Sequence, residues 1–309
     1  MSSAIVLATL VFVLSNKLII KTKPQGSAIV DAARIISVAI KEKGFENAKP
    51  SMLREHGRID NYSFAESPMY TDDRVHKVQT GVTACKFFVF LPLYFISWIQ
   101  IWNNLISQAG TMALHGTPND LLQNLDPIAL IIFLPLLDFV IYPQLRRWKI
   151  NFRPAVKITF GFLMAAVAMA YAAVLQHFIY KSPPNSIHVW IQAPAYILVA
   201  FSEAFVIVTG LEIAFTKAPE SLRSFVSALF WLTIGIAAAL CISLTPVTKD
   251  PEILWLYTSL AIITFAAGCV FYACFRNSLE DGPVIESTSI DEDVAFQKEK
   301  EHEAGFEKV

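Results

Sequence analysis

Seven long apolar stretches constrain the fold of this chain more than any other feature of its sequence. A helix needs about 20 mostly apolar residues to cross the roughly 30 Å hydrocarbon core of a bilayer. None of the stretches shows the strict apolar–polar alternation of an outer-membrane barrel strand, so helices are the only structure that can span a membrane here. The predicted spans are residues 3–20, 82–107, 125–145, 155–180, 188–211, 224–248 and 253–275.

The composition agrees with a lipid-embedded protein and argues against several soluble classes. Charged residues make up 17% of the chain, against about 25% in a soluble domain. A net charge of −1 offers no basic surface to a nucleic acid. The four cysteines all lie in apolar stretches, which favours neither disulfides nor a metal site. The common nucleotide-binding, zinc-protease and serine-hydrolase motifs are absent, so we expect no enzyme, no metal and no cofactor.

The basic residues predict the orientation of the spans. Ten Lys and Arg lie in residues 21–80, five in 146–157 and two in 212–223, whereas the opposite links contain only Lys181 and Lys249. Lys and Arg concentrate in cytosolic loops of membrane proteins. We therefore expect the N-terminus outside and the C-terminus in the cytosol.

The predicted spans and their orientation divide the chain into four parts. The cytosolic loop is expected to contain one amphipathic helix, capped by Ser27 and lying on the inner leaflet with one apolar side. The tail after Arg276 contains ten acidic and three basic residues, which is typical of a disordered segment. The predicted parts are a first span (1–20), the loop (21–80), a six-helix bundle (81–276) and the acidic tail (277–309).

Glu203 is the charged residue that most needs an explanation, because it lies well inside the span 188–211. A charge within a membrane segment is costly and is a functional candidate by default. Such a carboxyl can hold a proton, bind the ammonium group of a substrate, or pair with a Lys or Arg on another helix. A purely structural ion pair is the alternative.

Lys86 and Asp138 form a second pair of interest. They lie four and seven residues from the cytosolic ends of neighbouring antiparallel spans, so a rise of about 1.5 Å per residue places them at similar depths. They can form either a fixed bridge or a gate that opens. Lys86 can also extend alone to the membrane surface.

The span 82–107 ends in an amide-rich stretch that includes the candidates Asn103 and Asn104. In a continuous helix, residues 100, 104 and 107 share one face. Lipid cannot satisfy such side chains, so they must face either protein or a water-filled cavity. Helix packing alone and a substrate-binding role both remain open. The polar residues of this stretch are Gln100, Asn103, Asn104, Ser107 and Gln108.

Five stretches of the sequence resemble the proton-coupled oligopeptide transporters of the major facilitator superfamily, the fungal di- and tripeptide transporters in particular. The most specific is the last, in which a glutamate-bearing helix is followed by a GLE…AP segment and another helix. The stretches are QGSAIVDAARII (25–36), WNNLISQAG (102–110), NDLLQNLDPIALIIFLPLLDFVIYP (119–143), KITFGFLMAAVAMAYAAVLQ (157–176) and VWIQAPAYILVAFSEAFVIVTGLEIAFTKAPESLRSFVSALFWLT (189–233).

The resemblance implies proton-coupled symport of di- and tripeptides by alternating access between two six-helix halves. The proton is then the coupling ion, and the plasma membrane is the expected location. The seven spans correspond to helices six to twelve, that is, the C-terminal half and the helix before it. Glu203 matches the tenth-helix glutamate, which engages the peptide's amino end and takes part in proton coupling.

Other site residues are implied by the same resemblance. Asp126 falls where many relatives have an asparagine near the peptide backbone. Lys86 and Asp138 resemble a salt bridge that closes the cytosolic side, although Lys86 is displaced by about a turn from the usual basic residue. The positions that match pocket aromatics are Phe95, Trp98, and Phe230 or Trp231.

The sequence also departs from the family pattern, since nothing in it matches the first five helices. The first-helix ExxER-type motif and the cationic partners expected opposite Glu203 belong to that part. We therefore expect a truncated transporter that lacks its N-terminal half and transports poorly alone. A non-transporting scaffold or regulatory fragment is the alternative. A seven-helix receptor is disfavoured, because DRY-like and NPxxY motifs are absent.

Overall fold

The computed structural model describes residues 2–15, 28–62, 70–149, 152–216, 218–219 and 222–276. The chain divides into two compact units, one up to Val75 and one from His76 onward. The division falls inside one helix, α4 (Asp72–Cys85). The predicted acidic tail, 277–309, lies outside the described residues, as does the predicted cap Ser27.

The first unit contains the loop that the sequence predicts to be cytosolic. Helix α2 buries Ile35 and Val38, and the carboxylate of Asp31 on α2 accepts a hydrogen bond of 3.0 Å from Arg74 on α4. Ile40, also on α2, is exposed, and contact of the predicted amphipathic helix with a membrane stays a prediction. The elements of this unit are α1 (Ser2–Leu14), α2 (Ala28–Lys41), α3 (Pro50–Glu55), η2 (Ile59–Asn61) and the start of α4.

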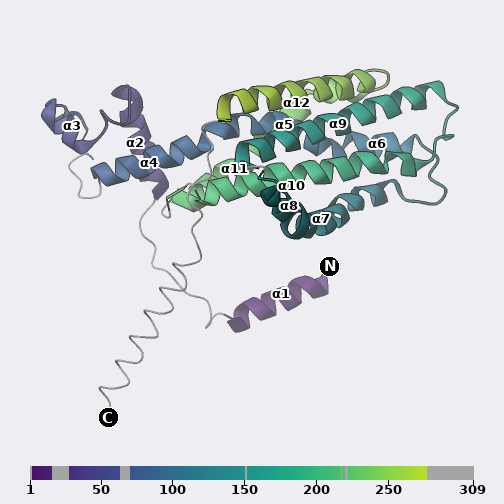
Figure 1. The fold of residues 1–309 in the computed structure, drawn as a ribbon, viewed down its shortest axis with the longest axis horizontal. Helices are drawn as coiled ribbons and strands as arrows, with labels where there is room; N and C mark the ends of the chain where they lie inside the picture. The colour runs from purple at the N-terminus through teal and green to yellow at the C-terminus, as the bar shows by residue number, and fades with distance from the viewer. Residues whose placement is uncertain are drawn as a thin grey trace, which may run out of the picture. The chain divides into compact units, whose positions relative to one another are not determined.

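The second unit is a bundle of long apolar helices (Figure 1). Helix α9 packs against both α10 and α12, α5 packs against α11, and α7 packs against α10. The helices are α5 (Leu91–Ile99), α6 (Asn104–Gly110), α7 (Leu125–Leu136), α8 (Tyr142–Arg147), α9 (Pro154–Lys181), α10 (Ala193–Thr216), α11 (Arg223–Ser243) and α12 (Ile253–Phe275).

Five helical segments of the described chain are long and apolar enough to cross a membrane. A sixth is added if the segments Asp72–Val89 and Leu91–Gly110, which meet at 45°, form one broken span. Of the predicted first span, 3–20, the structure describes a short apolar helix, Ile5–Leu14, and not residues 16–20. The seventh span therefore stays a prediction. The five spans are Leu121–Arg147, Pro154–Lys181, Val189–Thr216, Arg223–Ser243 and Ile253–Phe275.

The segment predicted as one span, 82–107, is not a single straight helix. It consists of α4, a 3-10 turn over Lys86–Val89, α5, a second 3-10 turn over Gln100–Trp102, and α6. Pro92 lies in the first turn of α5, where a missing backbone N–H is tolerated, so the preceding helix ends before it. A second break follows at Asn103, whose φ of −120° and ψ of −90° are not helical.

The neighbouring span is irregular for a similar reason. Pro135 lies inside α7, and a π-helical segment, Leu137–Ile141, follows it before α8 begins with Pro143 in its first turn. Proline removes one backbone hydrogen bond from a helix and crowds the preceding turn. The widened turn carries Asp138, which is exposed.

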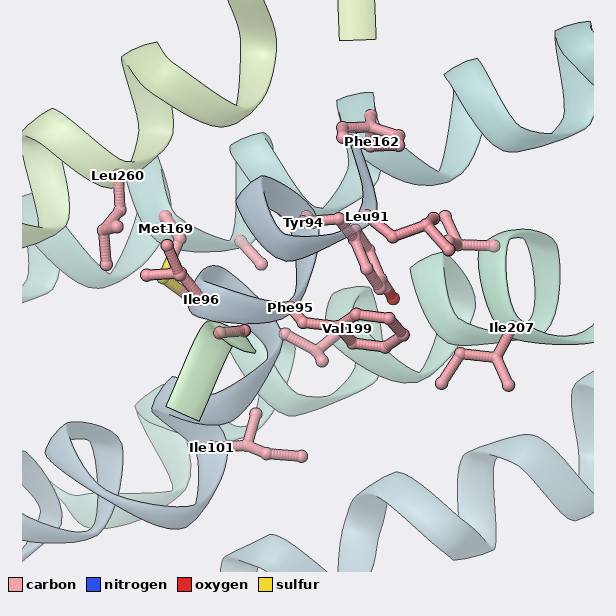
Figure 2. Close-up of a cluster of buried hydrophobic side chains, with 14 of the residues drawn as sticks. Leu91, Tyr94, Phe95, Ile96, Ile101, Phe162, Met169, Val199, Ile207 and Leu260 are labelled. Atoms are coloured by element: carbon pink, nitrogen blue, oxygen red, sulfur yellow. The ribbon is translucent and has the colours of Figure 1, made fainter. Parts of the chain in front are cut away.

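The core of the bundle surrounds α5, as Figure 2 shows. Tyr94 and Phe95 are fully buried there, and the ring of Tyr94 lies 5.5 Å from that of Phe162 on α9. Because lipid is itself apolar, close packing of this kind, rather than exclusion of water, holds membrane helices together. The labelled residues are Leu91, Tyr94, Phe95, Ile96, Ile101, Phe162, Met169, Val199, Ile207 and Leu260.

Gly161 sets the approach of α9 to α10. A Cβ at this position would meet the side chain of Val206 and would lie 2.8 Å from the backbone oxygen of Ser202. Small residues at helix interfaces allow this kind of approach. Because α10 carries Glu203 next to Ser202, this contact helps to position the candidate site.

Candidate functional site

The carboxylate of Glu203 is held by an indole from another helix. Trp98 Nε1 on α5 donates a hydrogen bond of 2.9 Å to Glu203 Oε2 on α10. Glu203 is partly buried, and Trp98 is also partly buried. A hydrogen bond to a charged group in an apolar bundle offsets part of the cost of removing that group from water.

A second polar contact joins the same two helices one turn away. The hydroxyl of Tyr94 lies 3.0 Å from Oγ of Ser202, and both residues are buried. Tyr94 and Trp98 are four residues apart on α5 and therefore share a face, while Ser202 precedes Glu203 on α10. Tyr94 was not among the predicted site residues, although it lies four residues before Trp98 and therefore on the same side of a helix.

Asp126 lies beside Glu203. Asp126 is in the first turn of α7 and is 4% exposed. Its carboxyl group is near enough to that of Glu203 for the two to interact electrostatically, and its Oδ1 atom has no hydrogen-bond partner. The fold thus brings together two carboxyl groups that are 77 residues apart in the sequence.

The predicted aromatic residues form a continuous chain of edge-to-face contacts. The ring of Phe95 lies 5.8 Å from that of Trp98 and 6.0 Å from that of Phe230 on α11. Phe230 is fully buried, whereas its neighbour Trp231 is 52% exposed. Phe230 therefore shares an aromatic cluster with the Trp98–Glu203 pair, and Trp231 adjoins the cluster from the outside at a ring separation of 5.7 Å.

The amide-rich stretch is arranged differently from the prediction. Gln100 and Asn104 are buried and bonded to each other at 2.6 Å, as a shared face requires. Ser107, predicted on that face, is exposed, and Asn103 is exposed as well. Asn104 and Ser107 both lie on α6, after the break at Asn103, so the buried part of the predicted face includes Gln100 and Asn104 but not Ser107. No hydrogen bond joins these amides to Glu203 within the described residues.

Gln108 takes part in a buried hydrogen-bond network that was not predicted from the sequence. Its amide donates to Gln176 on α9 at 2.7 Å, and Gln192 donates to Gln108 at 2.8 Å. Both unrecognised partners were visible as single glutamines within otherwise apolar spans. For Gln108, helix packing is therefore the arrangement that the structure supports.

Lys86 and Asp138 do not meet in this conformation. Both side chains are exposed, and no ion pair joins them within the part of the chain that the structure describes. The gate stays a prediction, because a contact of this kind can form in another state of the protein. The described residues also contain no group of three or more His, Cys, Asp or Glu that could hold a metal ion.

Comparison with known proteins assigns the chain to a family. The sequence profile of the POT family matches residues 2–258. The chain belongs to the POT family. Members of this family are transporters and not enzymes, and they need no cofactor. Together with the apolar helices, family membership makes the chain an integral, multi-pass membrane protein.

Two curated relatives of this POT family member are proteins of yeasts. It is 40% identical over 290 residues to a probable peptide transporter of Schizosaccharomyces pombe, a match that covers 89% of this chain and 46% of the relative. It is 39% identical over 284 residues to a peptide transporter of Saccharomyces cerevisiae, covering 88% of this chain and 45% of the relative. The chain therefore spans about half the length of these relatives.

Solved structures confirm the fold. An auto-inhibited POT family peptide transporter matches with a TM-score of 0.62 at 18% identity, over 85% of this chain and 56% of that one. A POT peptide transporter in complex with sulfate matches with a TM-score of 0.57 at 20% identity, over 91% of this chain and 54% of that one. The predicted all-helical major facilitator fold is thus confirmed, and the receptor and scaffold alternatives are not favoured.

Proposed function

We propose that this chain supplies the C-terminal half of a proton-coupled symporter of di- and tripeptides that works by alternating access. The observation that carries the proposal is Glu203, a carboxylate in the membrane part of the bundle whose indole partner belongs to an aromatic cluster. A carboxylate held in this way can bind the ammonium group of a peptide or take up a proton.

The aromatic cluster supports a peptide site for a physical reason. The ring faces of Trp98 and Phe95 offer apolar surface to peptide side chains, and aromatic faces also attract ammonium groups. In the proposed site, Glu203 and Asp126 supply the polar contacts. Phe230, Trp231, Asn103 and Asn104 stay in the proposed site as residues whose contact with substrate is untested.

The proposed site is half of a complete one. The curated relatives are about twice as long as the matched region, and the cationic partners of Glu203 that the resemblance implies belong to their other half. We therefore infer that the chain transports poorly alone and that an N-terminal half is its partner. The proposed location is the plasma membrane. The proposed orientation places the N-terminus outside the cell and the C-terminus in the cytosol.

A thermal-shift experiment on the purified chain in lipid nanodiscs tests the site. Ligand that binds the folded state raises its apparent stability. Dialanine at millimolar concentration is expected to raise the melting temperature of the wild-type chain. N-acetyl-dialanine, which lacks the ammonium group, is expected to leave it unchanged.

Substitution separates the proposed site from general effects of charge. Glu203→Gln is expected to abolish the shift with dialanine. Glu252→Gln, at an exposed residue just before α12, is the matched control and is expected to retain it. An equal shift for Glu203→Gln and wild type, or no shift in either, contradicts the proposal.

A further inference from the structure

Two loops at one end of the bundle are joined by backbone hydrogen bonds. The backbone N–H of Ala113, in the loop after α6, donates to the carbonyl of Ile187 at 2.7 Å. The backbone N–H of Val189 donates to the carbonyl of Ala113 at 3.1 Å, and both residues are buried. These bonds therefore tie the end of the broken span to η7 (Val189–Gln192), the 3-10 turn that leads into α10.

Each of the two loops also contributes a histidine next to these bonds. The imidazole rings of His115 and His188 are stacked, with their centroids 4.9 Å apart and an angle of 12° between the ring planes. His115 has a φ of 46°, which is uncommon for a residue other than glycine, so the loop adopts a specific conformation where the rings meet. Both residues are exposed, so protons from water can reach the rings.

The hydrogen bonds of the rings specify where their protons are. Nδ1 of His188 accepts the backbone N–H of Trp190 at 3.3 Å and thereby caps η7. A charged imidazole carries N–H groups on both ring nitrogens and has no acceptor, so this bond requires a neutral His188 with its proton on Nε2. Nδ1 of His115 donates to the carbonyl of Ala113 at 3.4 Å, which both the neutral and the charged ring can do. The cap is therefore specific to the neutral form of His188.

A proton on His188 would oppose this arrangement in two further ways. His188 immediately precedes the long helical segment Val189–Thr216, and a positive charge is unfavourable at the N-terminal end of a helix. If His115 is charged as well, the two stacked rings repel each other. Both effects act in the same direction as the loss of the acceptor.

In the described part of the chain, no acidic side chain offsets a charge on either ring, because its ion pairs all lie in the first unit. From α9, Tyr171 donates to the carbonyl of Ile191 next to the cap, and Tyr180 donates to Asp250. The other titratable groups at this end of the bundle are His177 and Lys181 of α9, Glu252 before α12, and Asp120 of η5 (Asn119–Asn124), whose side chain lies outside the described residues.

We propose that His115 and His188 form a proton-sensitive strap, which holds the two loops together while His188 is neutral and releases them when His188 binds a proton. Imidazoles change charge between about pH 5 and 8, so the strap is closed at the upper end of this range and opens as pH falls. In the proposed orientation the strap lies on the outer side. Acid there would loosen the ends of the two helical segments that carry Trp98 and Glu203, and this part of the proposal rests on the proposed function.

Hydrogen–deuterium exchange of the full chain in lipid nanodiscs tests the strap without any substrate. Exchange rates are corrected for the direct effect of pH on amide exchange. In peptides that cover residues 111–118 and 186–192, wild type is expected to exchange about 2- to 30-fold faster at about pH 5.5 than at about pH 7.5, the range that corresponds to loss of a helix cap.

Three variants make the assignment specific. His188→Asn keeps a capping acceptor that does not titrate, so its exchange should be slow at both pH values. His177→Asn, at an exposed histidine of α9, is the matched control and should retain the response to acid. Asp120→Asn should retain it as well. The proposal is overturned by equal exchange of wild type at the two pH values, by a response that persists in His188→Asn, or by a response that disappears in either of the other variants.

NMR of the wild-type chain provides a readout that needs no substitution. Ile187–His188 is the only Ile-His pair in the sequence, so 13C-carbonyl isoleucine together with 15N-histidine selects His188. At about pH 7.5 its Nδ1 is expected to give the signal of a ring nitrogen without a proton. The signal of a protonated Nδ1 at that pH would also overturn the proposal. A failure of dialanine to bind would leave both measurements unaffected, so the strap and the proposed function fail separately.

Discussion

The indole Nε1 of Trp98 donates a hydrogen bond of 2.9 Å to Glu203, across the two helices α5 and α10. This bond connects a residue of the broken span to the acidic residue of an unbroken helix. It therefore couples the position of α5 to the charge that the proposed function uses. Its strength can be measured independently of transport.

Trp98→Phe is expected to destabilise the chain by about 0.5–2 kcal/mol, because it keeps an aromatic ring and removes the donor to Glu203. Chemical or thermal unfolding in nanodiscs measures the change. Trp102→Phe, at a residue that is 48% exposed, is the matched control and should have little effect. In a double-mutant cycle, Trp98→Phe should cost less in the Glu203→Gln background than in wild type. Equal costs in both backgrounds would mean that the bond adds nothing to stability.

Gly161→Ala is expected to destabilise the bundle by about 1–3 kcal/mol, because the added Cβ collides with α10 at Val206 and at the backbone oxygen of Ser202. Thermal unfolding measures this effect. Gly235→Ala is the control, since a Cβ at that position meets nothing within 4 Å. That change should be neutral or stabilising, because alanine favours helix over glycine by up to about 1 kcal/mol. Similar behaviour of the two variants would exclude close α9–α10 packing.

The loop unit should be sensitive to acid through Glu42. Its carboxylate accepts hydrogen bonds from Tyr62 at 2.9 Å and from Arg58 at 2.6 Å, and these bonds lower the pKa of Glu42. A lowered pKa in the folded state stabilises the fold above the ordinary value of about 4.3, and this contribution is lost as pH falls through the lowered pKa.

NMR titration of chain labelled with 13C at glutamate carboxyls measures that pKa. Tyr62→Phe removes the larger of the two effects and is expected to move the pKa of Glu42 upward, toward its ordinary value. Asp60→Asn, two residues away and exposed, should leave it where it is. A Glu42 titration unaffected by Tyr62→Phe would show that the hydrogen bond is not formed in solution.

The sequon Asn61-Tyr62-Ser63 reports the orientation of the loop. Glycosylation occurs on the non-cytosolic side of the membrane, and the positive charge of residues 21–80 predicts that Asn61 faces the cytosol. Chain produced in a fungal host should therefore show no change in mobility after glycosidase treatment. A sequon engineered into the opposite link, 108–124, is the positive control. Modification of Asn61 would invert the proposed orientation.

Span prediction succeeded where the apolar run is unbroken. The predicted spans 155–180 and 253–275 correspond to α9 (Pro154–Lys181) and α12 (Ile253–Phe275). It was less accurate for 82–107, where the chain bends before Pro92 and again at Asn103. Hydropathy records how apolar a segment is, but a break in the helix depends on local backbone hydrogen bonding and on neighbouring helices.

The site shows the same division between local and tertiary information. Glu203 was identified because placing a charged side chain inside a membrane span costs free energy. This cost can be recognised from the residue and its apolar neighbours in the sequence. Trp98 was a predicted site residue, but its hydrogen bond to Glu203 was not anticipated. Ser107 was grouped with Gln100 and Asn104 on one face, but it is exposed, because which residues of a helix are covered depends on the neighbouring helices.

The sequence by itself determined that this chain is a helical membrane protein and that it resembles peptide transporters. Apolar length and the need to satisfy every backbone group in lipid leave few alternatives. Only the tertiary structure decided which polar groups meet: Trp98 with Glu203, and Gln108 with Gln176 and Gln192. Such contacts depend on how each helix is rotated, broken and packed, and no local pattern of residues specifies these properties.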